Sequence, residues 1–288
     1  MYKRQHYTFD PGQKDNKQHL WLLTESTRTN HPTTQYEYGK RCTEDRQIQK
    51  RILPNGRTLT IHYKSLEKGK KPHEDPSHAR VTELQQPVGK YQFIYTPAEY
   101  GKTDGHTDVY DAHHNRTRFN YSKNFIIQCI THYAGEDTLL YKEIFDWFSQ
   151  ESDKRNWLQR KTLKDAENNL IHSKTYEYDS KGNVIAENNL ANFKGPTQDT
   201  YTITQSFYPA TNLLHRRYEP NALITEYHYL ENTPLISAKI IYANEQIKQR
   251  TFYTYDNTIL KEEIIDNGQT LDKDDLSHVT KRLIKTIT

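Results

Sequence analysis

The sequence has little of what most enzymes and metal proteins need. Its 288 residues include 2 Cys, 11 Gly and 1 Met. Cys42 and Cys129 form no C-x-x-C pair, so they offer neither a zinc ribbon nor a redox motif. No Gly-rich phosphate loop and no G-x-S-x-G nucleophile signature occurs. The sequence therefore predicts no catalytic residue, no cofactor-binding residue and no metal site, and we expect no enzymatic activity.

Long apolar runs are also absent. The N-terminal residues, Met1 to Tyr7, lack the apolar core of a signal peptide, and no stretch approaches the length of a transmembrane span. We therefore expect no membrane insertion. Export from the cell would depend on a different segment or on a dedicated secretion machine.

Charge of one sign does not dominate. There are 40 Lys+Arg against 37 Asp+Glu, a formal net charge of +3, with the two signs interspersed. This balance predicts no nucleic-acid partner. The densest basic run, Lys64 to Lys71, is interpreted as a solvated loop. Arg116 and Arg118 lie next to Phe119 and Tyr121 in the sequence, an arrangement that imitates a stacking platform for single-stranded nucleic acid. A repeating β-ribbon produces the same spacing.

Tyrosine is abundant. The chain has 22 Tyr although only 33% of its residues are hydrophobic. A tyrosine supplies a large apolar ring with a polar tip, which suits a sheet that is wetted on one or both faces. The aromatic content of 12% and the regular alternation of residues argue against disorder.

Many of these rings occur in pairs separated by one residue. Such a spacing places both rings on the same face of a β-strand. The pattern is clearest at Tyr176-Glu177-Tyr178, which runs directly into Asp179. It recurs at Tyr36/Tyr38, Tyr91/Phe93/Tyr95, Phe119/Tyr121, Tyr227/Tyr229 and Tyr253/Tyr255. The sequence therefore predicts a repeated unit of strand and turn.

The predicted turns share a chemistry. The segments Asp111 to Asn115, Asp165 to Asn169 and Asp179 to Asn183 align without gaps. The leading Asp can accept a backbone N–H two residues later, and the fourth position, His114, Asn168 or Gly182, is a residue type that tolerates positive φ. This combination predicts a hairpin built on a type I turn and closed by a left-handed residue.

These residues resemble the YD-repeat family, also called RHS repeats, whose unit reads aromatic-x-Tyr-Asp, two variable residues, Gly, then Asn or Arg. Tyr176 to Asn183 matches the whole unit, and Phe119/Tyr121 and Tyr253 to Asp256 match in part. The chain departs from the unit where no glycine follows Asp256 and where His114 fills the glycine position, and we expect looser or differently shaped turns there. The degenerate repeats extend from about Leu53 to the C-terminus.

The resemblance implies a function. In bacterial polymorphic toxins and insecticidal toxin complexes, YD repeats form a β-ribbon that spirals into a hollow shell around a toxic segment, and teneurins use a related shell for adhesion. Bacterial members often have a closing core that cuts off the cargo. No counterpart of that core precedes Thr288, so we assign no autoprotease.

The expected organisation is all-β, with antiparallel β-hairpin repeats forming an extended, curved or spiralling sheet. Residues 1–54 are interpreted as diverged strands of the same sheet, and residues 55–288 as one continuous ribbon. The best candidate break is Phe193 to Pro196. The spacing in Leu139 to Phe148 fits either a helix or a strand, and we predict a strand because both flanks are β.

Two residue clusters suggest metal sites at first sight. His113-His114 lies in a predicted turn and lacks further ligands at suitable spacing. Asp266-Asn267-Gly268 with Asp272, Asp274 and Asp275 does not have the spacing of an EF-hand loop. We interpret the second cluster as a surface turn followed by an acidic, solvated loop.

The resulting functional hypothesis is a non-catalytic segment of a shell that encloses a toxin or other cargo. The alternative is a module for cell-surface adhesion or carbohydrate binding. The expected partners are the remainder of a longer RHS protein or its toxin cargo, or a surface carbohydrate or protein. The expected location is secreted or associated with the cell envelope.

Overall fold

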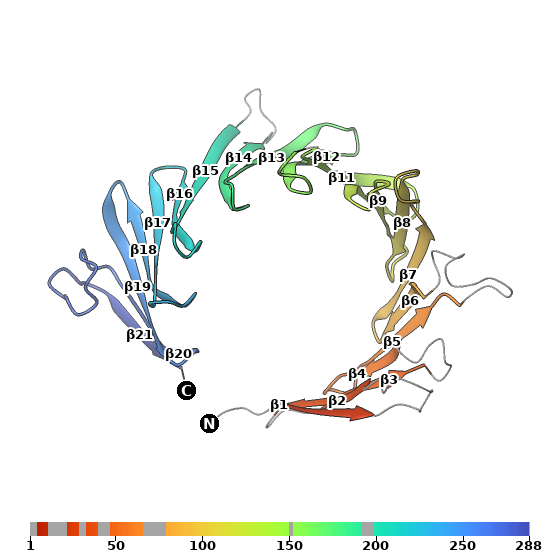
Figure 1. The fold of residues 1–288 in the computed structure, drawn as a ribbon, viewed down its shortest axis with the longest axis horizontal. Coiled ribbons are helices and arrows are strands. Elements are labelled where there is room, and N and C mark those ends of the chain that lie inside the picture. The colour runs from red at the N-terminus through yellow and green to blue at the C-terminus, as the bar shows by residue number, and fades with distance from the viewer. Residues whose placement is uncertain are drawn as a thin grey trace. The chain divides into compact units, whose positions relative to one another are not determined.

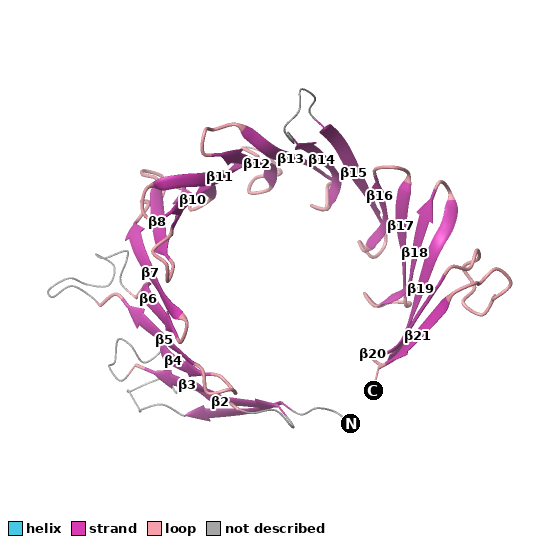
Figure 2. Ribbon diagram, turned by 180° about the vertical axis from the view of Figure 1, so that it is seen from behind, coloured by secondary structure: helices cyan, strands magenta, loops and turns pink. Residues whose placement is uncertain are grey.

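The fold is known from a computed structural model that describes residues 5–10, 22–28, 33–39, 47–65, 79–149, 152–191 and 199–287. Every helix or strand assigned in these ranges is a β-strand (Figure 2). The predicted all-β fold built from antiparallel hairpins is therefore confirmed. Among the described residues there is no helix that could span a membrane. Cys42, Phe193 to Pro196 and most of Lys64 to Lys71 lie outside the described residues.

The chain divides into two compact units, Met1–Ile144 and Phe145–Thr288. In the first unit each strand pairs antiparallel with the next strand along the chain (Figure 1). Its strands are β1 (Gln5–Asp10), β2 (Leu22–Arg28), β3 (Thr34–Tyr38), β4 (Ile48–Ile52), β5 (Thr58–Tyr63), β6 (Val81–Gln86), β7 (Gly89–Thr96), β8 (Gly105–Tyr110), β9 (Arg116–Tyr121), β10 (Ile127–Ala134) and most of β11 (Thr138–Trp147). The strand predicted over Leu139 to Phe148 is confirmed as β11.

The second unit has the same meander, in which β12 to β21 pair in sequence order. Its strands are β12 (Leu158–Asp165), β13 (Leu170–Tyr178), β14 (Val184–Ala191), β15 (Asp199–Phe207), β16 (Leu214–Glu219), β17 (Leu223–Tyr229), β18 (Ile236–Ala243), β19 (Gln246–Asp256), β20 (Ile259–Asp266) and β21 (Arg282–Thr286). Among the described residues few apolar side chains are buried, and two of the three largest fully buried side chains, Arg250, Ile240 and Asn189, are polar.

The Asp-led turns have the predicted geometry. In the turn from Asp179 to Asn183, Oδ1 of Asp179 accepts the N–H groups of Lys181 at 2.8 Å and Asn183 at 2.9 Å, and the Asn183 amide donates to Oδ2 at 2.7 Å. Gly182 has φ +90°, and the matching positions His114 and Asn168 have φ +61° and +69°. The expectation of a differently shaped turn at His114 is wrong, because histidine adopts the left-handed conformation that the turn requires.

The turn after Asp256 differs from the others, as expected, but it is tighter rather than looser. Asp256 pairs with Ile259, so the hairpin loop is only Asn257-Thr258, and Asn257 has φ +56°. Two-residue hairpins require such left-handed residues, and asparagine tolerates that conformation. The missing glycine therefore reflects a shorter turn.

The last tyrosine of each aromatic pair, and also Tyr63 at the end of β5, closes a hairpin. At or next to the end of seven strands, a tyrosine hydroxyl donates to a backbone carbonyl in the first or second residue of the preceding strand. We call these residues latch tyrosines. Their bonds are Tyr38 to Leu23 at 2.9 Å, Tyr63 to Ile48 at 3.0 Å, Tyr95 to Val81 at 2.8 Å, Tyr121 to His106 at 3.4 Å, Tyr178 to Leu158 at 2.7 Å, Tyr229 to Leu214 at 2.9 Å and Tyr255 to Ile236 at 3.1 Å.

A β-bulge directly precedes most of the latch tyrosines and orients their side chains. The register with the following strand shifts directly before Tyr38, Tyr63, Tyr178, Tyr229 and Tyr255. A bulge re-aims the side chain that follows it and increases the local twist. Burial raises the pKa of Tyr38, Tyr63, Tyr95, Tyr178 and Tyr229. The phenols therefore remain protonated donors over the physiological pH range.

Replacing Tyr178 by phenylalanine tests the latch. The ring would keep its contacts with Trp157, at 5.0 Å between centroids, and with Phe148, at 6.2 Å. Because only the hydroxyl is removed, we expect a loss of about 0.5–1.5 kcal/mol in the free energy of unfolding, measured by urea denaturation. Tyr176→Phe is the control, since the Tyr176 hydroxyl has no hydrogen bond to any described residue. Equal losses in the two variants would contradict the latch.

Candidate functional site

A row of alternating charges crosses one face of the second unit. Residues directly opposite each other in an antiparallel sheet project from the same face. The register places Arg216 opposite Glu226, Glu226 opposite Ile240, Ile240 opposite Arg250, Arg250 opposite Asp266 and Asp266 opposite Arg282. Ile240 and Arg250 are 0% exposed, Asp266 4% and Glu226 6%. We call these six residues the charged row.

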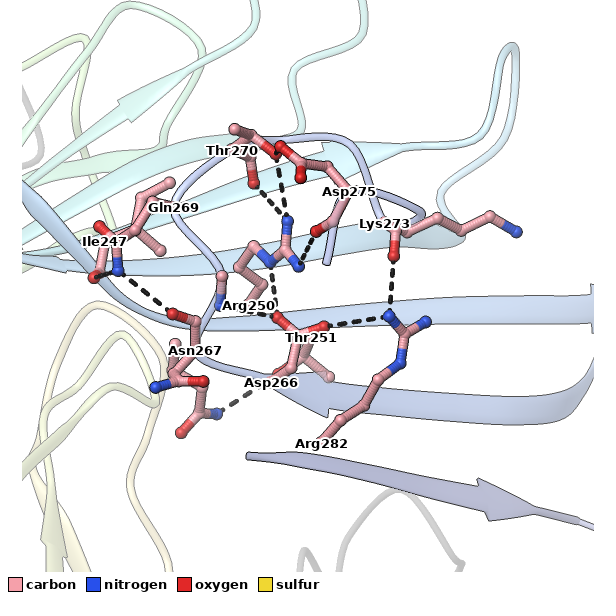
Figure 3. A network of polar contacts seen from close by, with 12 residues as sticks. Ile247, Arg250, Thr251, Asp266, Asn267, Gln269, Thr270, Lys273, Asp275 and Arg282 are labelled. Carbon is pink, nitrogen blue, oxygen red and sulfur yellow. Dashed lines mark hydrogen bonds and ion pairs between the residues drawn. The ribbon is translucent and has the colours of Figure 1, made fainter. Parts of the chain in front are cut away.

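Arg250 is the centre of the row, and Figure 3 shows the groups around it. Its Nε donates to Oδ1 of Asp266 at 2.6 Å, and both side chains are 0% exposed. Its Nη atoms donate to the carbonyl oxygens of Thr270 at 2.8 Å, Asp272 at 2.7 Å and Asp275 at 3.2 Å. A buried charge requires this degree of hydrogen bonding to offset its lost hydration. The guanidinium is therefore committed to the protein's own loop and does not face a ligand.

The loop after β20 is shaped to cover Arg250. A Cβ atom on Gly268 would overlap the Arg250 guanidinium, so this position accepts only glycine without displacing the arginine. The loop is closed by Asn267, whose Oδ1 accepts the N–H of Thr280 at 3.0 Å and of Lys281 at 3.1 Å. Arg282 on β21 adds a second cation 3.7 Å from Oδ2 of Asp266.

The acidic cluster from Asp266 to Asp275 is thus only partly what the sequence predicts. Asp272 and Asp274 are exposed, in agreement with a solvated loop. Asp266 is buried, so its interpretation as part of a surface turn is wrong. The reason is Arg250, which lies on another strand and draws the carboxylate inward. No group of three or more His, Cys, Asp or Glu residues that could hold a metal ion occurs in the described part of the chain.

The carboxylates of this loop have lowered pKa values. Hydrogen bonds from the Ser277 hydroxyl and N–H and from the Thr270 hydroxyl lower the pKa of Asp275 to about 2, from an ordinary value of 3.8. Burial alone would raise the pKa of Asp266, but the hydrogen bonds from Arg250 and the Gly268 N–H outweigh it and lower the pKa.

These shifts predict acid sensitivity. A carboxylate with a lowered folded-state pKa contributes stability above its unfolded pKa, and that contribution is lost as the pH falls toward the folded value. For Asp275 the loss lies between about pH 4 and pH 2. We expect the urea midpoint of the second unit to fall between pH 5 and pH 2.5, and to fall less in Asp275→Asn. An identical pH dependence in both proteins would show that Asp275 has no part in it.

Glu226 is a second buried carboxylate in the charged row. Its Oε2 lies 3.0 Å from Nη2 of Arg216, and its Oε1 lies 3.3 Å from Nε2 of His228 and 3.6 Å from Nε2 of His215. The ion pair between Arg216 on β16 and Glu226 on β17 joins these neighbouring strands, and the two imidazoles lie beside the same carboxylate. Nothing in the local sequence distinguishes these residues from other charged residues of the chain.

In the first unit Asp108 is likewise a buried carboxylate paired with an arginine of the neighbouring strand. Arg118 binds it in a bidentate manner, with Nε to Oδ1 at 2.7 Å and Nη2 to Oδ2 at 2.8 Å. Arg116 lies over the Tyr133 ring at 4.0 Å. Both arginines thus have partners within the sheet, as the structural interpretation of this segment expects. His113 and His114 lie in the Asp111 turn, also as expected.

Comparisons with known proteins show similarity at the level of the fold. No family model matches the sequence, and no curated protein matches it. The fold is similar to that in the crystal structure of TcdB2-TccC3-Cdc42 and to that in a structure of the Photorhabdus luminescens Tc holotoxin pore with a mutation in TccC3. Each similarity has 15% identity and a TM-score of 0.52, and covers 86% of this chain and 12% of the other. This chain therefore has the fold of a segment of these much longer toxin-complex chains.

Proposed function

We propose that this chain is a non-catalytic wall segment of an RHS/YD-repeat shell that encloses a toxin or other cargo. Residues 55–288 would form one continuous ribbon, with residues 1–54 as diverged strands of the same sheet. The observation that carries the proposal is the repeated unit itself, in which an aromatic pair ends on a latch tyrosine and an Asp-led turn follows, as at Tyr178 and Asp179. The fold similarity to a segment of Tc toxin chains supports it.

The described polar clusters are consistent with a structural role. Arg250 and Asp108 are bonded to groups of the protein itself, and Glu226 forms an ion pair with Arg216 of the adjacent strand. Catalysis needs polar groups that converge on a site a substrate can reach. In this reading these charges fix the strand register of a wall that is poor in apolar core. The wall would isolate a reactive passenger until delivery.

The partners of such a wall would be the remainder of a longer RHS protein and its cargo, and its location would be secreted or associated with the cell envelope. The experiment is to purify the native polypeptide from its own cells, determine its intact mass and image it by electron microscopy. A mass far above 34.2 kDa together with a hollow particle is the expected result. A mass near 34.2 kDa with no hollow particle would contradict self-contained encapsulation.

A further inference from the structure

The first unit carries an exposed pair of aromatic rings that the wall architecture does not use. Tyr100, in the loop between β7 and β8, and Phe125, in the turn between β9 and β10, stack with 5.9 Å between centroids and 24° between planes. Tyr100 is 71% exposed and Phe125 56% exposed. Each ring thus contacts the other and leaves much of its surface to solvent. We call these two residues the aromatic platform.

Phe125 occupies a backbone position that disfavours it. The turn from Ser122 to Ile126 repeats the backbone hydrogen bonds of the Asp-led turns. Phe125 occupies the position that His114, Asn168 and Gly182 occupy in those turns, and its φ is +62°. A left-handed conformation is costly for a bulky residue. Residues held in strained backbone conformations are concentrated at functional sites, where the strain positions a group. An exposed ring at such a position is therefore a candidate binding group.

The platform is held in place before any ligand arrives. The Gly101 N–H donates to the carbonyl of Lys123 at 3.0 Å, and the Lys123 N–H donates to Oδ1 of Asp104 at 2.7 Å. These bonds join the loop to the turn. The loop is also closed on itself by two backbone bonds between Glu99 and Thr103. Preorganisation of this kind lowers the entropic cost of binding.

The local charges indicate the class of ligand. Two acids, Glu99 and Asp104, match two lysines, Lys102 and Lys123, and Glu99 forms an ion pair with Lys102. Nucleic acids and anionic lipids need a net positive surface, which this loop pair lacks. A neutral sugar does not need one. The weakly positive C–H face of a pyranose fits the negative face of an aromatic ring. We propose that the aromatic platform binds a neutral oligosaccharide by stacking, which goes beyond a role in the shell wall.

The test uses saturation-transfer NMR with cellotriose, maltotriose, chitotriose and lactose as probes. We expect at least one to receive saturation from the wild-type chain, and Phe125→Gly to lower its affinity about tenfold or more, as loss of one stacking contact does in other aromatic platforms. The melting temperature of Phe125→Gly should be unchanged or higher, because the strain is relieved. His114→Gly is the matched control, since it changes the same turn position without touching the platform.

Several outcomes would overturn the proposal. Binding of none of the sugars at millimolar concentration would do so, as would equal affinity in the wild type and Phe125→Gly. A fall in the melting temperature of Phe125→Gly would show that the ring is placed for stability. Binding of oligothymidylate or of phosphatidylserine vesicles at the platform, in place of sugar, would assign the surface to another class of ligand.

Discussion

Replacing Arg250 by methionine is expected to destabilise the second unit by about 3–5 kcal/mol, the cost of removing one partner from a buried ion pair. The substitution leaves the Asp266 carboxylate 0% exposed, and among the described residues only Arg282, at 3.7 Å, remains as a cation beside it. It also leaves the carbonyl oxygens of Thr270, Asp272 and Asp275 without their common donor. The covering loop would lose the group around which it is ordered.

The measurement is urea unfolding followed by tryptophan fluorescence, since Trp147 and Trp157 both lie in the second unit. Arg160→Met is the matched control. Arg160 also donates to a carboxylate at 2.6 Å, that of Asp146, but the two side chains are 53% and 38% exposed. An exposed pair of this kind contributes about 1 kcal/mol or less. Similar losses in the two variants would show that burial does not set the cost of losing Arg250.

The turns were predictable from sequence because their chemistry is local. An Asp, a residue that tolerates positive φ and an Asn lie within five positions, and their hydrogen bonds join residues two or four apart, as in Asp179 to Asn183. Strands next to a recognised turn were therefore found, including the hairpin of β12 and β13. The resemblance to YD repeats rests on the same local unit.

Strands without an aromatic pair or a recognised turn were missed. β10 and β16 were not among the predicted strands. In β16 the sequence Leu-His-Arg-Arg-Tyr-Glu is strongly polar. It forms a strand because Arg216 and His215 face Glu226 on β17, which is a tertiary effect. Strand propensity depends on such cross-strand neighbours, which a single window of sequence does not contain.

The candidate site was the least predictable feature. The acids from Asp266 to Asp275 are conspicuous in the sequence, but Arg250 lies 16 residues before Asp266 and nothing local distinguishes it from other arginines. The latch tyrosines show the same limitation. Their spacing is visible, but their acceptors lie 14 to 20 residues away, as with Val81 for Tyr95 and Leu158 for Tyr178. The fold, not the motif, brings donor and acceptor together.

Replacing Gly105 by alanine is expected to have the largest effect in the first unit. Gly105 is the buried first residue of β8, and its φ does not lie in the left-handed region. A Cβ atom there would lie 2.6 Å from the carbonyl oxygen of Thr96 and 2.6 Å from Cε2 of Tyr121, and would also overlap the backbone nitrogen of Ala98. Two of these three obstacles are backbone atoms, which cannot turn aside as a flexible side chain can.

To admit the methyl group, the end of β7 or the ring of Tyr121 must move. Either movement disturbs the Tyr121 hydroxyl, which donates to the carbonyls of Thr96 at 3.2 Å and His106 at 3.4 Å. We therefore expect a loss of about 3 kcal/mol, the upper end of typical overpacking costs. Hydrogen exchange of the β8 amides in the whole chain would report the change as loss of protection.

Gly135→Ala is the control for Gly105→Ala. A Cβ atom on Gly135 would meet nothing within 4 Å, but this glycine has φ +64°. Its substitution therefore isolates the backbone cost of a left-handed alanine, about 1–2 kcal/mol. The excess loss in Gly105→Ala measures the steric overlap at the start of β8. If Gly105→Ala lost no more stability than Gly135→Ala, that result would contradict the close packing of Gly105 against the end of β7 and the ring of Tyr121.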